Sequence, residues 1–359
     1  MEKIFGVLSP AVIFAVIFLL NAFLPGRNIK GYICRPGSEY RMTYHLNGIF
    51  VFLVVLAGWF LLGITDTVPF DYLYRYRWYG LAGACLLGII ISLALVLSAP
   101  PVRKYFIADF FLGRIENLQL MNGRVDMKMW LYLAGATMLE LNVLSFTAYH
   151  LISYGGYASP GIILSAALLT YFVVDYLVFE EVHLYTYDLF AERIGFKLGW
   201  GCIVFYPYFY PIALWATVAR PDPGTPVLLL VLFVIIFFSG WMLARGANMQ
   251  KYFFKRDPQK HFLGIVPESI TDGNKKLLIS GFWGLSRHIN YLGEILMATG
   301  IILCTGYPGL LWPWLYPLYY VILLFTRQAD DDRRCSLKYG ALWDEYQRKV
   351  PWRIIPYIW

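Results

Sequence analysis

Residues 48–64, "GIFVFLVVLAGWFLLGI", run for 17 positions without a charged side chain. A helix that crosses the hydrocarbon core of a bilayer needs about 20 mainly apolar residues, so this stretch predicts a transmembrane helix. Similar runs recur along the 359 residues, of which 59% are hydrophobic. The runs are continuous rather than alternating, which favours helices over the strands of a membrane barrel.

We therefore expect an all-α, polytopic membrane helical bundle with nine or ten transmembrane helices. The last two runs are short or interrupted by proline and would form a tight hairpin through residues 305–308. The longest connecting stretch, residues 245–290, is near the lower limit for an independent core, so we expect no soluble domain. The candidate spans are residues 10–24, 48–64, 79–98, 130–149, 161–179, 198–219, 226–244, 291–304 and 309–324.

The basic residues predict how the helices are oriented. Counting the spans in order divides the connecting segments between two sides, and 26 of the 30 Lys and Arg residues fall on one side. Short loops rich in Lys and Arg face the cytosol, so we expect the carboxyl terminus in the cytosol and the amino terminus opposite. The formal net charge of +7 then reflects topology, with some charge left to bind an anionic ligand, and needs no nucleic-acid partner.

Cysteine and histidine give no sign of a disulfide framework or of a metal site. The five cysteines form no Cys-x-x-Cys pair, and Cys34 and Cys335 fall on the reducing cytosolic side. The five histidines are scattered along the chain. We expect neither a disulfide nor a bound metal.

The stretch "GFWGLSRHINYLGE", residues 281–294, places polar groups where a membrane helix begins. In a helix, Asn290, Tyr291 and Glu294 share a face with Arg287, because they follow it by three, four and seven residues. The alternative is an interfacial anchor with a snorkelling arginine, but such an anchor needs neither the asparagine nor the deeper glutamate. A functional face is therefore the favoured interpretation.

Two further cationic segments lie on the same side of the membrane. Lys and Arg make charge-assisted hydrogen bonds with phosphate oxygens, so three such clusters could converge on a polyanion. The alternatives are topological charge for the loop and, for the tail, a solvated helix on the membrane surface, which spacing alone slightly favours. No P-loop or Gly-x-Gly-x-x-Gly motif is present. The loop carries Lys251, Lys255 and Arg256, and the tail carries Asp331, Cys335, Tyr339 and Tyr346 in one stripe with Arg333, Arg334 and Lys338 beside it.

Acidic residues and a tyrosine lie deeper, near the ends of apolar runs. A carboxyl or phenol in apolar surroundings keeps its proton at neutral pH and can act as a general acid. The alternative for Tyr210 is strong, because the chain has 28 tyrosines and many would lie at membrane interfaces. The members of this group are Asp175, Glu180, Glu181, Asp188 and Tyr210.

These residues occur in motifs that resemble a known family. "LLISGFWGLSRHINYLGE" (residues 277–294), "ANMQKYFFKR" (residues 247–256) and the tail from residue 331 are similar to signatures of the integral-membrane sterol carbon–carbon double-bond reductases. That family includes sterol C-14 reductases, 7-dehydrocholesterol reductases, C-24(28) reductases and the reductase-like half of the lamin B receptor. "YHLNG" (residues 44–48) and "FFLGR" (residues 110–114) resemble its amino-half motifs, and Asp175, Glu180 and Asp188 keep the order of its acidic segment.

The resemblance implies one integral-membrane reductase domain over residues 1–359, with amino-half helices in residues 1–174 and a catalytic half in residues 175–359. It implies protonation of a sterol alkene from the bilayer, followed by hydride transfer from NADPH. Tyr210 matches the proposed proton donor, and Glu180 or Asp188 would organise its hydrogen bonds. The substrate region would include Asp175, Cys202 and Glu294. The expected cofactor-binding residues are Lys251, Lys255, Arg256, Leu278, Trp283, Arg287, Asn290, Tyr291, Asp331, Cys335 to Tyr339 (with Lys338) and Tyr346.

The sequence departs from the family at positions that bear on the substrate and the cofactor. Lys255 stands where the family usually has Arg, and Cys202 stands where it often has Asp.

The residues leave open whether the C-14 or the C-7 double bond is reduced, with C-24(28) disfavoured. Two other classes stay open: a methyltransferase of the isoprenylcysteine type that uses S-adenosylmethionine, and a non-catalytic sterol-binding scaffold. The cationic loop favours NADPH, because a 2′-phosphate needs cations and a sulfonium cofactor does not. The membrane would be the endoplasmic reticulum in a eukaryote and the inner membrane in a bacterium; the oligomeric state is open.

Overall fold

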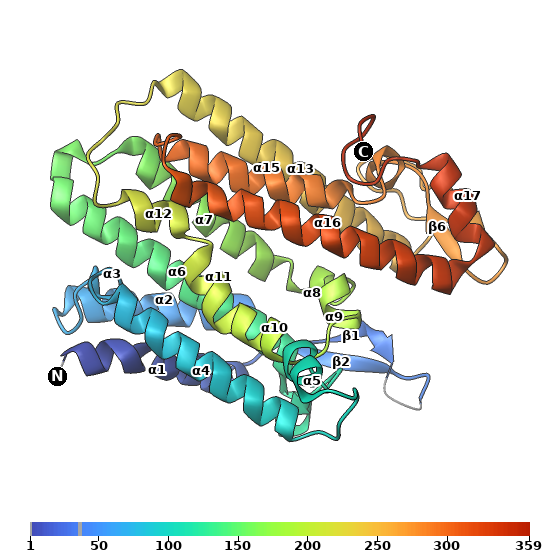
Figure 1. The fold of residues 1–359 in the computed structure, drawn as a ribbon, viewed down its shortest axis with the longest axis horizontal. Helices are drawn as coiled ribbons and strands as arrows, with labels where there is room; N and C mark the ends of the chain where they lie inside the picture. Colours follow the sequence, from blue (N-terminus) through green and yellow to red (C-terminus); the bar gives the residue numbers. More distant parts are fainter. Residues whose placement is uncertain (1, 35–37) are drawn as a thin grey trace. The chain divides into compact units, whose positions relative to one another are not determined.

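The computed structural model describes residues 2–34 and 38–359 of the chain (Figure 1). The chain forms two compact units, Met1–Pro223 (unit 1) and Gly224–Trp359 (unit 2), which are described separately. Helices dominate both, and the sheets found among the described residues are two-stranded. The expected all-α, polytopic class is confirmed. The expected single domain with halves that meet at residue 175 stays a prediction.

Unit 1 is built around one long helix, α6 (Met127–Tyr154), which is buried along most of its length. Asp126 caps its first turn by accepting hydrogen bonds from the backbone amides of Lys128 and Met129. The other long helices are α1 (Glu2–Phe23), α2 (Gly48–Ile64), α4 (Arg77–Leu97) and α7 (Pro160–Val178). The short elements are β1 (Arg27–Cys34), β2 (Arg41–Leu46), α3 (Tyr72–Arg75), α5 (Phe106–Leu112), β3 (Gln119–Leu120), η1 (Met121–Gly123), β4 (Val125–Asp126), η2 (Gly155–Tyr157), α8 (Glu180–His183), α9 (Tyr187–Phe190), α10 (Phe196–Trp200), η3 (Gly201–Phe205), α11 (Tyr206–Phe209) and α12 (Ile212–Thr217).

Helices α1, α2, α7 and the segment from η3 to α12 all contact α6. The indole of Trp130 on α6 meets the rings of Phe14 and Phe18 on α1 edge-on, with centroids 6.2 and 5.6 Å away. Edge-to-face aromatic pairs of this kind add to the gain from close packing. The acidic and aromatic residues of interest in unit 1 are therefore carried by elements that pack on one helix.

Unit 2 consists of long helices that lead to a smaller polar end. Its elements are α13 (Val227–Arg256), β5 (Ser269–Thr271), β6 (Lys276–Leu278), α14 (Phe282–Leu285), α15 (Ile289–Cys304), α16 (Leu311–Tyr339) and α17 (Ala341–Lys349). Helices α13 and α15 approach so closely that the carbonyl oxygen of Gly293 lies 2.6 Å from where a Cβ of Gly240 would be. Small residues at such a crossing let two membrane helices pack backbone to backbone.

The nine expected spans all fall on helical segments. Helices α1, α4, α6, α7 and α13 are long and apolar enough to cross a membrane by length and composition, while α2 and α15 are shorter apolar helices. Helix α16 begins with the ninth run, and α15 contacts α16 as the expected hairpin requires. A tenth apolar helix has no counterpart among the described residues.

Two expected elements differ in form. Residues 198–219 were expected as one span, but the structure divides them among α10, the π-helical turn η3, α11 and α12. Pro207 and Pro211 lack the amide hydrogen that a continuous helix needs, which accounts for the interruption. The last span and the polar tail, in contrast, form one continuous helix, α16.

Candidate functional site

Helix α14 is held against α13 by the side chains of Gln250 and Trp283. The Gln250 side chain accepts a hydrogen bond from the Phe282 amide (3.0 Å) and donates one to the Ser280 carbonyl (3.2 Å). The indole of Trp283 donates to the Ala247 carbonyl at 2.8 Å. The Lys251 ammonium lies 5.2 Å from the centre of the Trp283 ring. The structure thus brings together Lys251 and Trp283, two expected cofactor-binding residues 32 positions apart.

Arg287 is buried and binds the carboxyl-terminal segment. One guanidinium nitrogen, Nη1, donates to the carbonyls of Val350 and Pro351, each at 3.1 Å, and Nη2 lies 3.3 Å from Asp332 Oδ2. The Arg287 amide donates to the Trp352 carbonyl at 2.9 Å. Loss of this side chain would leave buried carbonyls without a donor, so Arg287 holds the fold whether or not it also contacts a ligand.

His288 and Asp332 form the centre of a buried polar group beside Arg287. His288 Nε2 lies 3.8 Å from Asp332 Oδ1 and 3.9 Å from Asp331 Oδ2. Gln328 donates to Asp332 Oδ2 at 2.6 Å. Burial alone would raise the pKa of Asp332, but the neighbouring His288 and the positive charge of Arg287 outweigh it and lower the pKa. A carboxylate is therefore kept charged inside unit 2.

Four buried polar atoms in this region have no hydrogen-bond partner among the described residues. They are Arg287 Nε, His288 Nε2, Asn290 Oδ1 and Asp332 Oδ1. The amide nitrogen of Asn290 lies 3.4 Å from Asn248 Oδ1, a long contact. His288 Nε2 and Asp332 Oδ1 lie 3.8 Å apart, so each lowers the cost of burying the other. A buried polar atom without a partner carries a free-energy cost, so Arg287 Nε and Asn290 Oδ1 in particular indicate a place for a polar ligand or water. We call Arg287, His288, Asn290 and Asp332 the polar cluster.

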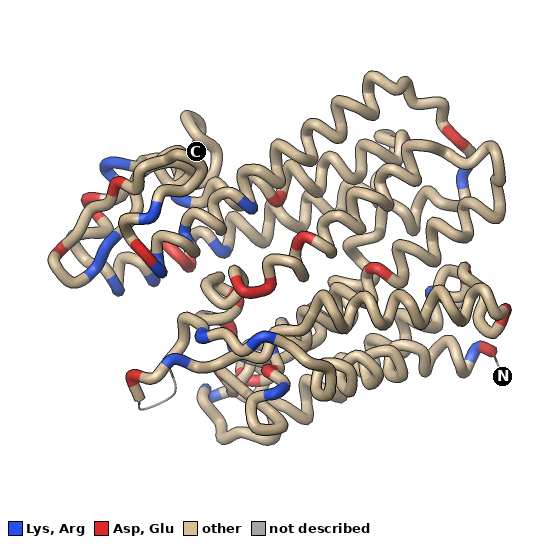
Figure 2. Tube along the Cα trace, turned by 180° about the vertical axis from the view of Figure 1, so that it is seen from behind, with Lys and Arg blue, Asp and Glu red and all other residues tan. Residues whose placement is uncertain are grey.

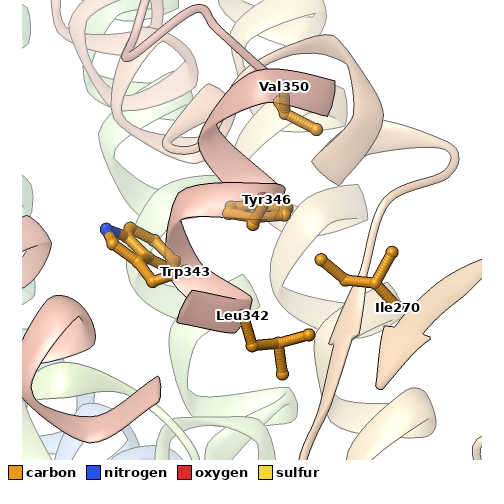
Figure 3. Close-up of a cluster of buried hydrophobic side chains, with 5 residues drawn as sticks. All are labelled: Ile270, Leu342, Trp343, Tyr346 and Val350. Atoms are coloured by element: carbon orange, nitrogen blue, oxygen red, sulfur yellow. The ribbon is translucent and has the colours of Figure 1, made fainter. Parts of the chain in front are cut away.

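A small apolar core supports the tail beside the polar cluster (Figure 3). Ile270, Leu342, Trp343, Tyr346 and Val350 pack together, and Cys335 and Tyr339 line the same core. The Tyr346 hydroxyl donates to the Trp283 carbonyl at 3.2 Å. The core therefore ties α17 to α14, which carries Trp283.

Burial sets the protonation of two expected site residues at this core. It raises the pKa of the Tyr346 phenol well above its usual value and that of the Cys335 thiol to about 12. Both groups are therefore neutral at physiological pH. They can offer packing and neutral hydrogen bonds but no negative charge.

The remaining expected cofactor-binding residues surround this region of unit 2. Leu278 is buried on β6, and the Tyr291 ring stacks on the His288 imidazole at 4.8 Å. The Arg256 guanidinium donates to the Tyr252 hydroxyl, and the exposed Lys338 ammonium lies 5.2 Å from the Tyr339 ring. Lys255 is partly exposed on α13, Asp331 is partly exposed on α16, and Glu294 is partly buried on α15.

In unit 1, the Glu180 carboxyl is fixed by Gly48, the last residue of the motif "YHLNG" (residues 44–48). Its Oε2 accepts a hydrogen bond from the Gly48 amide at 3.1 Å. The preceding Asn47 donates to the carbonyls of Asn21 and Leu24 at 3.0 and 3.1 Å, joining the end of α1 to the start of α2. Burial raises the pKa of Glu180 to about 7, although the Gly48 amide and the charge of Arg27 oppose the increase. A carboxyl near neutrality can hold or release a proton at physiological pH.

Tyr210 lies at the end of α11, just after the π-helical turn. Its ring contacts Tyr206 at 4.6 Å and the ring of Phe172 on α7 at 6.3 Å. Cys202 is buried in the same π-helical turn, η3. π-helical turns often occur at functional sites, because the extra residue changes the direction of the side chains that follow. Asp175 on α7 and Asp188 on α9, which precede Tyr210 by 35 and 22 residues, are partly buried.

The structure also shows functional candidates that the sequence did not single out. Gly48 binds Glu180, which is 132 residues away in sequence. Asp332 binds Gln328, four residues earlier, and Arg287, 45 residues earlier. Glu140 on α6 is fully buried, accepts a hydrogen bond from Thr170 at 2.8 Å and has no described partner for Oε2. An acidic residue inside an apolar helix is a visible signal, because such residues are rare in membrane spans.

The fold and the site define a polytopic helical membrane protein with a buried polar cluster in its carboxyl-terminal unit. The chain belongs to the family described as "Ergosterol biosynthesis ERG4/ERG24 family", whose model matches residues 2–359.

Three relatives cover nearly the whole chain. It is 32% identical to the Delta(14)-sterol reductase of Arabidopsis thaliana, over 99% of this chain and 98% of that protein. It is 31% identical to the Delta(14)-sterol reductase of Methylotuvimicrobium alcaliphilum, over 95% of this chain and 80% of that protein. It is 33% identical to the Delta(14)-sterol reductase TM7SF2 of mouse, over 94% of this chain and 81% of that protein. The expected family is confirmed.

Proposed function

We propose that this protein is an NADPH-dependent reductase of the Δ14 double bond of a sterol, acting in sterol biosynthesis. Family membership over residues 2–359 and the shared name of three relatives support a sterol double-bond reductase. Between the C-14 and C-7 bonds that the residues left open, the names of these relatives favour C-14. The observation that carries the site is the polar cluster, in which Asn290 has an unpartnered side-chain oxygen and lies 3.4 Å from Asn248 on α13, the helix that also carries Lys251.

The residues present fit a dinucleotide carrying several phosphates. Lys251, Lys255 and Arg256 supply positive charge on the last two turns of α13 for phosphate oxygens. Asn290 Oδ1, which lacks a described partner, can accept a hydrogen bond from a ligand amide or hydroxyl. When bound, NADPH would supply hydride to the substrate. Trp283 and Tyr291 offer aromatic faces for flat rings, held in place by Ala247 and His288.

The acidic residues of unit 1 suit the other half of the reaction. An isolated alkene accepts a proton at one carbon, and the adjacent carbon becomes electron-deficient until hydride arrives. Tyr210 would donate that proton from an aromatic environment that limits competing water. Glu180, when protonated, would donate a hydrogen bond to the phenolate as it forms, and Asp188 would help to organise the hydrogen bonds around it. Asp175 and Cys202 would line the substrate region. The net reaction consumes one hydride and one proton and saturates one bond.

The sterol would reach its site from the bilayer, because the substrate is apolar and five helices are suited to crossing a membrane. The distribution of Lys and Arg supports a cytosolic carboxyl terminus, on the side where NADPH is found.

The activity test uses the purified full chain in vesicles with a Δ8,14-sterol, a Δ7-sterol, NADPH and NADH. Saturation of the Δ14 bond with NADPH is expected, with weaker binding as salt rises, because screening weakens phosphate contacts. Turnover of the Δ7-sterol alone would contradict the C-14 assignment. Equal affinity for NADH and NADPH would remove the phosphate role from the cationic loop.

The proton donor is tested by Tyr210→Phe, which keeps the ring and removes the proton. Turnover should fall by ~10²-fold or more, while binding of NADPH and sterol is retained. Tyr208→Phe, two residues earlier in the same segment, is the matched control and should retain most activity. Near-normal turnover of Tyr210→Phe would exclude it from the mechanism and direct attention to Glu180 or Asp188.

A further inference from the structure

The loop that joins α13 to β5, residues 257–268, has an apolar residue at its tip. We call this segment the return loop. The backbones of Phe262 and Ile265 pair through two hydrogen bonds of 3.1 and 2.9 Å, so Leu263 and Gly264 form a two-residue turn. Both turn residues have positive φ angles, 52° and 77°. Asparagine, aspartate or glycine normally occupies the first of these positions, because a larger side chain is strained there.

Leu263 gains little from packing within unit 2 in return for this strain. A bulky residue in the left-handed region costs roughly 1–2 kcal/mol. Its side chain is 75% exposed, and that of Val266 is 57% exposed. Strained residues that persist at exposed positions often have a function, so we ask what covers these two side chains.

The height of the return loop along α13 points to the membrane surface. The ring of Phe262 lies 5.8 Å from that of Phe253 and 6.4 Å from that of Phe282. Phe282 packs against Gly246, only two residues beyond the end of the apolar run at Ala244. At ~1.5 Å per residue, positions 246–253 lie about 3–14 Å beyond that end. The loop starts at residue 257, about 20 Å beyond that end, and then folds back along α13 until the Phe262 ring lies beside Phe253 and Phe282. The lipid headgroups occupy roughly the first 5–8 Å, so the returning segment at Phe262 overlaps their level.

The charges around the tip suit anionic headgroups. Lys260 is exposed, with its ammonium 4.4 Å from the Phe253 ring, and Arg256 and His261 are exposed as well. Asp257 and Glu268 are the acidic residues at the two ends of the loop. Lys260 and His261 lie nearer to Leu263 in sequence than either acidic residue does. An apolar tip with basic residues directly before it is typical of segments that lie in the membrane interface.

We propose that the return loop is an interfacial anchor, in which Leu263 and Val266 insert into the leaflet from which α13 emerges. Lys260 then contacts the phosphate groups of anionic lipids. Two exposed apolar side chains are far too small for a stable protein interface, which buries about 800 Å² on each partner. They suffice for lipid, because the span of α13 already holds the loop beside the bilayer. This inference does not depend on the reductase activity.

The test places an environment-sensitive NBD fluorophore on the tip. Leu263→Cys is labelled in a Cys34→Ser, Cys85→Ser, Cys335→Ser background, and the full chain is reconstituted in phosphatidylcholine vesicles with or without phosphatidylserine. Leu337→Cys, at an apolar position that is 84% exposed on α16, is the matched control. Label at position 263 should emit at shorter wavelength than label at 337 and should be quenched by lipids carrying a nitroxide in the upper acyl chain.

Lys260→Glu should reduce this quenching in vesicles with phosphatidylserine and leave it unchanged in phosphatidylcholine alone. Water-like emission at position 263, equal to that at 337, would overturn the proposal. A shielded label without lipid quenching, together with cross-linking between two copies through position 263, would also overturn it and assign the tip to a second copy. Leu263→Asn relieves the backbone strain and should fold, so that its thermal unfolding shows whether the turn itself is preserved.

Discussion

At Gly48, any side chain would collide with the Glu180 carboxyl, which the Gly48 amide holds in place. A Cβ there would lie 2.6 Å from Glu180 Oε1, well inside van der Waals contact. The amide of Gly48 also donates the hydrogen bond to Glu180 Oε2. One residue therefore sets both the position of the carboxyl and its partner, although 132 residues separate them in sequence.

Gly48→Ala should displace the Glu180 side chain and lower sterol turnover by up to ~10²-fold, the lower end of what a positioned proton-transfer group contributes. The measurement is steady-state turnover of purified protein together with its thermal unfolding in detergent. Gly58→Ala on the same helix is the control, because no atom lies within 4 Å of its new Cβ. Equal activity of the two variants would show that the position of Glu180 is unimportant.

The raised pKa of Glu180 predicts a pH-dependent stability. The pKa rises from 4.5 to about 7 on folding, so the folded state binds more protons between these values. The contribution of Glu180 to the free energy of unfolding is therefore complete below about pH 4.5 and is lost as the pH rises through about 7. The melting temperature should fall between pH 5 and pH 8, and it should fall less in Glu180→Gln. Glu181→Gln, one residue away, controls for the loss of a carboxylate; the same pH profile in all three proteins would contradict the assignment.

The sequence indicated which residue types carry chemistry but not what each would contact. Arg287 was expected to face a ligand, yet most of its hydrogen bonds go to carbonyls 63 and 64 residues away. These partners follow α15, α16 and α17 in the chain, so their position depends on the tertiary fold. The local spacing of residues in the sequence carries no information about it. The resemblance of the motifs supplied the candidate roles that spacing alone could not.

Among the elements, α13 and α15 depend most directly on small residues. A Cβ at Gly240 would lie 2.6 Å from the Gly293 carbonyl oxygen and 2.7 Å from the Met297 amide nitrogen. Helices in lipid gain no hydrophobic effect from association, so close packing of this kind has to hold them together. The polar cluster begins at the amino-terminal end of α15, so its position follows from this crossing.

Gly240→Ala should separate the two helices and destabilise unit 2 by roughly 1–3 kcal/mol, the usual cost of overpacking. The expected result is a lower melting temperature in detergent and weaker NADPH binding. Gly309→Ala is the control, because its Cβ would meet nothing within 4 Å. An unchanged melting temperature for Gly240→Ala would mean that the crossing can adjust without loss.

The existence of the long helices could be predicted because uninterrupted apolar runs leave few alternatives in a membrane. Their form was harder to predict. Residues 198–219 read as one span by composition, but two prolines and a π-helical turn divide them, and Tyr210 lies at one of the breaks. Helix α16 continues from its apolar run through the charged tail, because no proline or glycine intervenes between Pro317 and Gly340.

At the scale of the whole molecule, charge follows topology. In unit 2, the Lys, Arg, Asp and Glu positions gather at the end that carries the carboxyl terminus (Figure 2). Of the 30 Lys and Arg residues, 26 fall in the connecting segments assigned to one side. So uneven a distribution sets the orientation of a multi-spanning chain at insertion, because basic loops are retained in the cytosol.

The assigned orientation predicts opposite reactivity for two loops. Asp222→Cys lies between the interrupted span and α13, and Lys276→Cys lies on β6; both positions are exposed. In a Cys34→Ser, Cys335→Ser background, sealed vesicles with the cytosolic face outward should let a membrane-impermeant maleimide modify Lys276→Cys at once. Asp222→Cys should react only after detergent opens the vesicles. Residue 222 follows six expected spans and residue 276 follows seven, so the two positions should lie on opposite sides of the membrane. Reactivity of both positions from one side would mean that α13 does not cross the membrane. Reversed reactivity would mean that the orientation of the whole bundle is the opposite of the one assigned.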